Sequence, residues 1–267
     1  MPISPPSTVK EQIKLAMLLK DTILETYNPE VIILFGSLGR GDTDEFSDVD
    51  LLVVMKTEGD VNDLGNEISN YLDPISTHKH IIVQTPRDFF LKQDIPGTIV
   101  FSAIQEGRIL FEKSDRQIMA PPIESYNARK REVLDQEYIQ TALEFLSQAE
   151  SQHQKRHLFR SRDLMRFAII RAIKGIFVKH DIHPPRETDL LTLITQAKNL
   201  ESKLEQYMDL IHKLNDYIPD STGHAGNLKN SKMLQKTTEF VIDVITPYGI
   251  NPKMRTSSCF KSESDSI

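Results

Sequence analysis

The sequence has a single cysteine, Cys259, so no disulfide can form within the chain. One thiol in a polar segment is typical of proteins that stay in a reducing compartment. The sequence also lacks any apolar run near the roughly 18 residues that span a membrane, and its start does not have the pattern of a signal peptide. These absences predict a cytoplasmic protein.

The sequence also has no excess of positive charge. The sequence has 32 Lys and Arg against 38 Asp and Glu, which gives a formal net charge of −6. This balance argues against a general nucleic-acid binder. With 267 residues, the chain can hold one large domain or two modest domains, each with its own core.

The most informative feature is a strand–bend–strand pattern. Residues 31–35 form an unbroken apolar run, which predicts a buried strand. The glycine-rich residues that follow allow a sharp turn and bring N–H groups close to phosphate oxygens. Asp48 and Asp50 then open a second predicted strand, and residues two apart in a strand share one face. Two carboxylates beside such a bend suit Mg²⁺.

A simpler alternative is a glycine turn beside two solvated aspartates on an open sheet face. Aspartate is a poor strand former, and two carboxylates on one face are costly unless a cation or hydrogen-bond donors neutralise them. We therefore favour the cation-binding interpretation.

The pattern resembles the nucleotidyltransferase superfamily, in particular its small prokaryotic members. These share Gly-Ser, about ten residues and Asp-x-Asp; here Gly36-Ser37 is followed by ten residues and Asp48-Val49-Asp50. Arg40-Gly41 and Ser47 match the longer form of the motif. The resemblance implies that Gly36 and Ser37 hold the β- and γ-phosphates and that Arg40 adds positive charge. It also implies that Asp48 and Asp50 bind one or two Mg²⁺ ions.

One position departs from that family. The third carboxylate usually opens a segment Asp-Ile-Ile-Val-x-Thr-Pro, and this chain has His80 in the aspartate's place. His80 would either contact a metal, with Mn²⁺ as a candidate, or accept a proton from the attacking hydroxyl. Alternatively, the third ligand is lost and the active site is weakened. Both interpretations stay open.

Periodicity predicts an α+β protein in two parts. The first has helices at 8–27, 61–72, 85–90 and 98–106 and strands at 31–35, 48–54, 80–84 and 108–111. A polar linker with Pro121-Pro122 leads to helices at 134–149, 158–178, 190–197, 200–217 and 228–245. We expect a nucleotidyltransferase domain with a small mixed sheet at 1–112, an all-α bundle at 130–248 and a disordered tail at 249–267.

The helical part resembles the HEPN family, which is found fused to, or encoded beside, small nucleotidyltransferases. The resemblance rests on three short segments: residues 172–177, residues 181–186 and Asp189-Leu190. Toxin members of this family cleave RNA with an arginine, a spacer of four to six residues and a histidine. The histidine at 224 has no suitable arginine upstream, so ribonuclease activity is not predicted. The resemblance places the bundle on the acceptor side of the cleft.

A basic run lies in the longest predicted helix. Lys155 to Lys179 includes eight Lys or Arg and one acid, Asp163. The run is either a solvated helix face or, if it borders the cleft, a surface for the triphosphate or an anionic acceptor such as RNA.

Together these features predict a metal-dependent enzyme that moves a nucleoside monophosphate, AMP from ATP, onto an acceptor hydroxyl. Asp48, Asp50 and His80 are its expected catalytic residues. The alternatives are a catalytically weakened, antitoxin-like regulatory protein that binds nucleotide, and a small-molecule enzyme of the aminoglycoside nucleotidyltransferase type. The sequence does not choose between protein, RNA and small-molecule acceptors, and it leaves a homodimer open.

Overall fold

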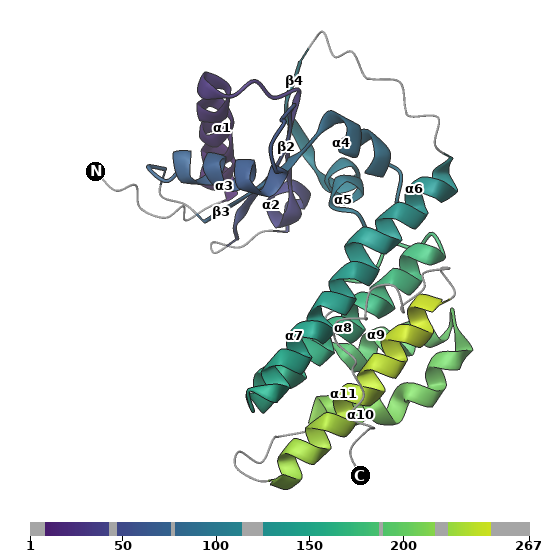
Figure 1. Cartoon of the computed structure of the whole chain (residues 1–267). Helices are drawn as coiled ribbons and strands as arrows, with labels where there is room; N and C mark the ends of the chain where they lie inside the picture. Colours follow the sequence, from purple (N-terminus) through teal and green to yellow (C-terminus); the bar gives the residue numbers. More distant parts are fainter. Residues whose placement is uncertain are drawn as a thin grey trace. The chain divides into compact units, whose positions relative to one another are not determined.

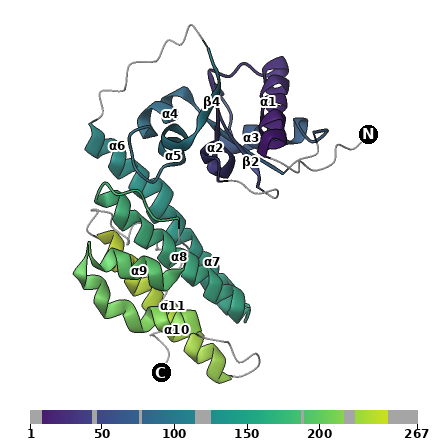
Figure 2. The same ribbon diagram turned by 180° about the vertical axis from the view of Figure 1, so that it is seen from behind.

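The chain folds into two compact units, Met1–Ser125 and Tyr126–Ile267. A computed structural model describes residues 9–42, 47–75, 78–113, 125–186, 189–216 and 224–246, and Figures 1 and 2 show it from opposite sides. The predicted tail at 249–267 and most of the predicted linker lie outside the described residues.

The first unit is built on a four-stranded sheet with the strand order β3-β2-β1-β4. Its strands are β1 (Val31–Phe35), β2 (Val49–Val54), β3 (Lys79–Gln84) and β4 (Arg108–Glu112). β1 pairs antiparallel with β2 and β4, whereas β2 pairs parallel with β3. The prediction of a small mixed sheet is therefore confirmed.

Helices cover both faces of this sheet (Figure 1). α1 (Val9–Thr26) and α3 (Val61–Tyr71) pack on one face, against the side chains of Leu34, Val49 and Leu51. α4 (Pro86–Lys92) and α5 (Ile99–Glu106) pack on the other, against Phe35 and Leu52. Because both faces are buried, β1 is apolar at every position, as the unbroken run predicted.

The second unit is a bundle of helices, and its described residues contain no strand. Three consecutive segments form one long helical stretch: α6 (Tyr126–Val133), the π-helix η1 (Leu134–Gln140) and α7 (Thr141–Gln154). The remaining elements are α8 (Leu158–Lys179), α9 (Leu190–Lys198), the 3-10 helix η2 (Ser202–Tyr207), α10 (Met208–Asp216) and α11 (His224–Ile245). An all-α second part confirms the predicted α+β class.

Some boundaries differ from the sequence prediction. α6 starts at Tyr126, inside the residues expected to form the linker. The helix expected at 200–217 is two elements, η2 and α10, and the last helix starts at His224 instead of residue 228. None of the helices that the structure describes is long and apolar enough to cross a membrane.

α8 is the central helix of the bundle and approaches η1 closely at a glycine. A Cβ atom on Gly175 would lie 3.3 Å from the Cβ of Tyr138, which is itself only 3 % exposed. The absence of a side chain at Gly175 therefore permits this close packing.

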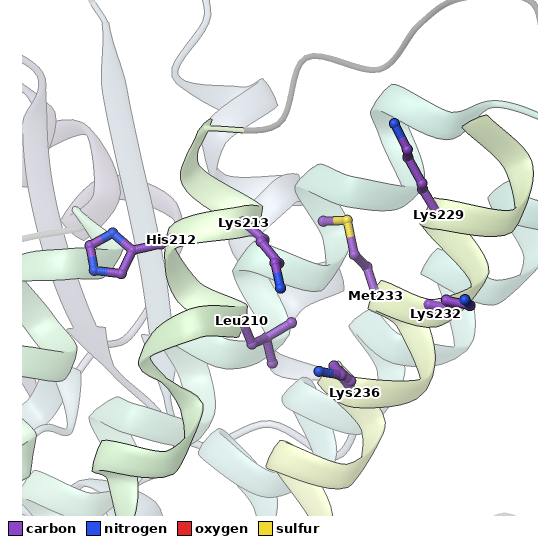
Figure 3. A pocket seen from close by; sticks show the side chains of 7 residues that line it. All are labelled: Leu210, His212, Lys213, Lys229, Lys232, Met233 and Lys236. Atoms are coloured by element: carbon purple, nitrogen blue, oxygen red, sulfur yellow. The ribbon is translucent and has the colours of Figure 1, made fainter. Parts of the chain in front are cut away.

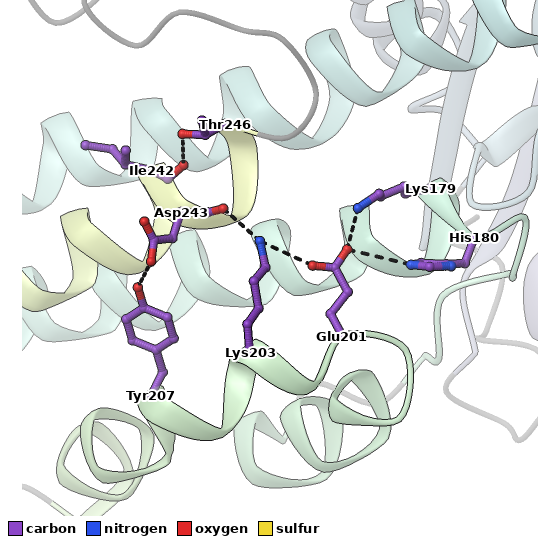
Figure 4. Close-up of polar contacts among 8 residues, drawn as sticks. All are labelled: Lys179, His180, Glu201, Lys203, Tyr207, Ile242, Asp243 and Thr246. Atoms are coloured by element: carbon purple, nitrogen blue, oxygen red, sulfur yellow. Dashed lines mark hydrogen bonds and ion pairs between the residues drawn. The ribbon is translucent and has the colours of Figure 1, made fainter.

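Ion pairs and hydrogen bonds connect the end of α8 to η2 and α11 (Figure 4). Glu201, whose side chain is only 11 % exposed, lies 2.5 Å from the Nζ of Lys179 and 3.3 Å from the Nζ of Lys203. Lys203 also donates to the carbonyl oxygen of Asp243, and the Asp243 carboxylate accepts from the hydroxyl of Tyr207. Burial alone would raise the pKa of Glu201, but the hydrogen bonds and charges of the two lysines outweigh burial and lower that pKa.

Replacing Glu201 by glutamine is expected to destabilise the bundle by about 1–2 kcal/mol at neutral pH, because the partly exposed Lys179 and Lys203 lose the counter-charge of a largely buried carboxylate. Since the pKa of Glu201 is lowered in the folded state, its contribution is fully present above the unfolded value of about 4.3 and is lost as the pH falls through the folded value. The variant should therefore show a flatter dependence of stability on pH in that acidic window. Urea unfolding monitored by circular dichroism measures both effects.

Glu205→Gln is the matched control, because Glu205 is four residues further along, within η2, and pairs with Lys198 but is 67 % exposed. This substitution should lower the free energy of unfolding by less than about 1 kcal/mol. Equal losses in the two variants would show that the Glu201 network contributes no more than a surface ion pair.

Candidate active site

The predicted site residues meet at one end of the sheet. In the strand pairing, Asp50 of β2 lies opposite Phe35 of β1 on one side and opposite His80 of β3 on the other. Gly36 follows Phe35 directly and begins a short helix, α2 (Gly36–Arg40). The glycine bend, an aspartate and the histidine are therefore adjacent because of strand register.

The carboxylate of Asp50 is packed against the backbone of the bend. Gly36 has a φ of +68°, which glycine adopts readily and other residues rarely do. A Cβ atom at Gly36 would lie only 2.1 Å from Oδ2 of Asp50, so no side chain fits at this position. Only glycine allows the Asp50 carboxylate to approach the chain here.

Asp48 and Asp50 differ in exposure. The Asp48 side chain is 59 % exposed, and the Asp50 side chain is 24 % exposed. Burial raises the pKa of Asp50, and the negative charge of Asp48 raises it further, while His80 and Arg40 act in the opposite direction. A half-buried carboxylate beside a second negative charge would be stabilised by a cation.

Each aspartate has a histidine next to it. Nδ1 of His80 lies 3.5 Å from Oδ1 of Asp50, and Nδ1 of His78 lies 4.0 Å from Oδ1 of Asp48. His80 was predicted from the sequence, and His78 was not. His78 directly precedes β3, and its spacing of two residues from His80, which mirrors the spacing of the aspartates, was the signal that would have found it.

The residues fit a divalent cation held by two carboxylates. Carboxylate oxygens are the ligands that Mg²⁺ prefers, and Mg²⁺ commonly uses one or two protein carboxylates together with phosphate oxygens and water. Over the ranges that the structure describes, no group of three His, Cys, Asp or Glu side chains is arranged to hold a metal. Asp48 and Asp50 are thus the candidate ligands, with substrate oxygens needed to complete the coordination.

Arg40, expected to add charge to a phosphate cradle, is engaged by two carboxylates. Its Nη1 lies 2.9 Å from Oε2 of Glu106, and its Nε lies 3.0 Å from Oδ2 of Asp42. The guanidinium therefore ties the end of α2 to the end of α5. These contacts use two of the five guanidinium N–H donors, so Arg40 keeps donors with which it could contact a phosphate.

The segment before Asp48 is supported by α1. Gln12 is 1 % exposed, and its Nε2 lies 3.5 Å from the carbonyl oxygen of Ser47. On the other side, the backbone N–H of Val49 donates to the carbonyl oxygen of His78. These contacts on both sides hold Asp48 at the edge of the sheet.

Most of the first unit resembles a known protein family. Residues 19–116 match the family model described as Polymerase beta, Nucleotidyltransferase. This segment therefore resembles a nucleotidyltransferase domain. The match includes the bend, both aspartates and His80, and ends shortly before the second unit begins. The HEPN resemblance of the helical unit stays a prediction.

Two solved structures resemble the chain over most of its length. A nucleotidyltransferase-like protein from Exiguobacterium sibiricum is 12 % identical with a TM-score of 0.42, covering 90 % of this chain and 77 % of that one. The spectinomycin adenyltransferase AAD(9) from Enterococcus faecialis, in a structure with ATP and spectinomycin, is 13 % identical with a TM-score of 0.42, covering 86 % of this chain and 100 % of that one. No curated protein matches the sequence.

The predicted basic run lies mainly on α8, and several of its charges have partners within the second unit. Lys179 pairs with Glu201, and Arg162 lies near Asp163 and over the ring of Phe159. Binding of the run to a triphosphate or RNA stays a prediction. The side chain of the histidine at 224, considered in the ribonuclease motif, lies outside the described part.

Proposed function

We propose that the first unit transfers a nucleoside monophosphate, AMP from ATP, onto an acceptor hydroxyl. The match of residues 19–116 to a nucleotidyltransferase family supports this activity. The observation that carries the proposal is the Asp50 carboxylate packed against Gly36, with Asp48 directly before the start of β2. This arrangement puts negative side chains beside a bend that can receive phosphate groups.

The bend would bind the β- and γ-phosphates. Gly36 and Ser37 are partly exposed at the start of α2, so their backbone N–H groups and the Ser37 hydroxyl are available as donors. Arg40 lies at the end of the same short helix and would add positive charge through the N–H donors that Asp42 and Glu106 do not occupy. Triphosphate binding is thereby directed to the bend, beside the aspartates.

Asp48 and Asp50 would hold Mg²⁺, or Mn²⁺, which polarises the α-phosphate and neutralises charge on the attacking and leaving oxygens. The acceptor oxygen forms a bond to the α-phosphorus as the bond to the pyrophosphate oxygen breaks, so AMP is transferred and pyrophosphate leaves. Nδ1 of His80 faces Asp50, which leaves Nε2 as the ring nitrogen that would accept the hydroxyl proton.

The activity is tested with ATP labelled at the α-phosphate, incubated with Mg²⁺ and, separately, total RNA, a soluble protein extract and an aminocyclitol antibiotic. We expect label to appear on one acceptor class with wild-type protein and not with the Asp48→Asn, Asp50→Asn double variant. Equal labelling by the double variant would refute the assigned roles. Which class of acceptor receives the nucleotide, and whether two chains form a homodimer, stay predictions.

A second candidate function is nucleotide binding without efficient transfer, as in a regulatory protein. The observation that favours it is His80, which takes the third carboxylate's place and is 65 % exposed. Calorimetry separates the two functions, because Mg²⁺-dependent ATP binding without label transfer to any acceptor would support the regulatory one.

Replacing His80 by aspartate provides a direct test of the missing ligand. The new carboxylate would lie beside Asp50 in the strand register, so we expect Mg²⁺ to raise the thermal midpoint more than in wild type and transfer to increase about tenfold. His80→Asn is the control, because asparagine is similar in size to aspartate but uncharged. Mg²⁺ should not raise the thermal midpoint of this variant more than that of wild type. An identical Mg²⁺ response in both variants would show that position 80 is not a ligand position.

A further inference from the structure

The helical unit has an open groove between α10 and α11 that the proposed transfer reaction does not use. The groove has a volume of about 520 Å³, which falls in the range of small-molecule sites. Its lining combines buried apolar side chains with an excess of basic ones (Figure 3). These residues are Leu210, His212, Lys213, Lys229, Lys232, Met233 and Lys236.

The floor of the groove is apolar and well packed. Leu210 of α10 is 3 % exposed and Met233 of α11 is 7 % exposed, and both belong to the hydrophobic core of the unit. α11 is also held against α7 and α8. The fully buried Asn230 of α11 donates to Nδ1 of His153 in α7 and to the hydroxyl of Ser161 in α8. The groove is therefore a formed feature of the bundle.

The rim of the groove is strongly positive. Lys229, Lys232 and Lys236 are exposed along α11, and none of them has an ion-pair partner among the residues that the structure describes. Lys213 faces them from α10 and pairs with Asp209, 2.5 Å away. Four ammonium groups thus surround an apolar floor, with Asp209 paired to Lys213 and also acting electrostatically on Lys236.

The size of the groove limits what it can bind. Lys229 and Lys236 are seven residues apart, which is roughly 10 Å along a helix. This length is two turns, too short for the several phosphates of a nucleic-acid strand or for a long partner helix. A flat or chain-like apolar body with one anionic end matches both the floor and the rim.

From this juxtaposition we infer that the groove binds a small amphiphilic anion. The apolar body lies on Leu210 and Met233, and its phosphate, sulfonate or carboxylate group contacts the lysines of α11. This inference goes beyond the proposed transfer activity and does not depend on it, since every residue involved belongs to the second unit.

The test uses two fluorescent probes of nearly the same shape, the anionic anilinonaphthalenesulfonate and the uncharged phenylnaphthylamine. Wild-type protein should bind the sulfonate saturably and more tightly than the uncharged probe. The double variant Lys229→Glu, Lys232→Glu should weaken sulfonate binding at least about tenfold and leave the uncharged probe within about twofold. Raising the salt concentration should reduce only the sulfonate's affinity.

The control is Lys10→Glu with Lys155→Glu, which makes the same change in net charge at two exposed lysines outside the groove. It should change sulfonate affinity by less than about twofold. Met233→Gln, which keeps the size of the floor residue but makes it polar, should weaken both probes. Circular dichroism confirms that the variants remain folded.

Competition then identifies the chemical source of the anion. Displacement of the lysine-dependent signal by ATP assigns a phosphate ligand, and displacement by decanoate assigns a carboxylate. The inference is overturned if wild type shows no saturable sulfonate binding, if the two double variants lose affinity equally, or if the groove variant binds the sulfonate as well as wild type.

Discussion

Replacing Asp50 by asparagine is expected to lower nucleotidyl transfer at least about a thousandfold, because several kcal/mol of transition-state stabilisation depend on the cation that this carboxylate would hold. The fold should survive the change. Asp50 is only 24 % exposed and lies beside the charge of Asp48, so the neutral amide removes an unfavourable interaction. Transfer assays and thermal unfolding without divalent ions measure these two effects.

Asp73→Asn is the matched control for that experiment. Asp73 is 70 % exposed, pairs with Lys79 at 3.1 Å and lies outside the site, so its variant should keep transfer within about twofold. If Asp50→Asn stayed folded and kept wild-type activity, the cation role of Asp50 would be wrong.

Replacing Gly36 by alanine is expected to abolish ATP binding and transfer, with a loss of at least about a hundredfold. The added methyl group would lie 2.1 Å from Oδ2 of Asp50, and the backbone φ of +68° disfavours alanine independently. Either the carboxylate or the bend must move, and both belong to the proposed site. Calorimetric titration with ATP and Mg²⁺, together with the transfer assay, measures the loss.

Gly59→Ala provides the comparison for the glycine experiment. Gly59 is exposed in the loop after β2, and an added Cβ would lie 3.7 Å from Oγ1 of Thr57, an ordinary contact. This variant should bind ATP like wild type. Equal behaviour of the two alanine variants would mean that the close approach of Asp50 to Gly36 is not required.

Local sequence pattern predicted the scaffold of the site well. β1 appears at the residues of the apolar run because both faces of the sheet are covered. β2 begins at Val49, one residue later than predicted, so Asp48 precedes the strand and only Asp50 lies within it. Strand register then decided which residues became neighbours. The pairing of Asp50 with His80 joins positions thirty residues apart, and no local pattern determines it.

α2 was not predicted, since the two glycines of its five residues disfavour a helix. Tertiary packing explains it. Leu38 is 1 % exposed in the core, and at Gly39 a Cβ atom would lie 2.9 Å from the carbonyl oxygen of Leu34. The turn of helix therefore forms because it buries Leu38 and brings the chain close to β1.

The ion pair between Arg40 and Glu106 could not be predicted from local sequence either. Glu106 is 66 residues further along the chain than Arg40, at the end of α5. The π-helix η1 was not predictable from local sequence either, because the spacing of its apolar residues is also compatible with an ordinary α-helix. Contacts between distant segments decided both features.

The support that Gln12 gives to Ser47 bears on how this domain can be dissected. The segment that matches the family model begins at residue 19, part-way along α1, and so omits both Gln12 and the fully buried Ala16. A fragment trimmed to the homologous region would leave the Ser47 carbonyl without this donor and open the sheet face that Ala16 covers. The smallest piece able to fold and react should therefore retain the whole first helix.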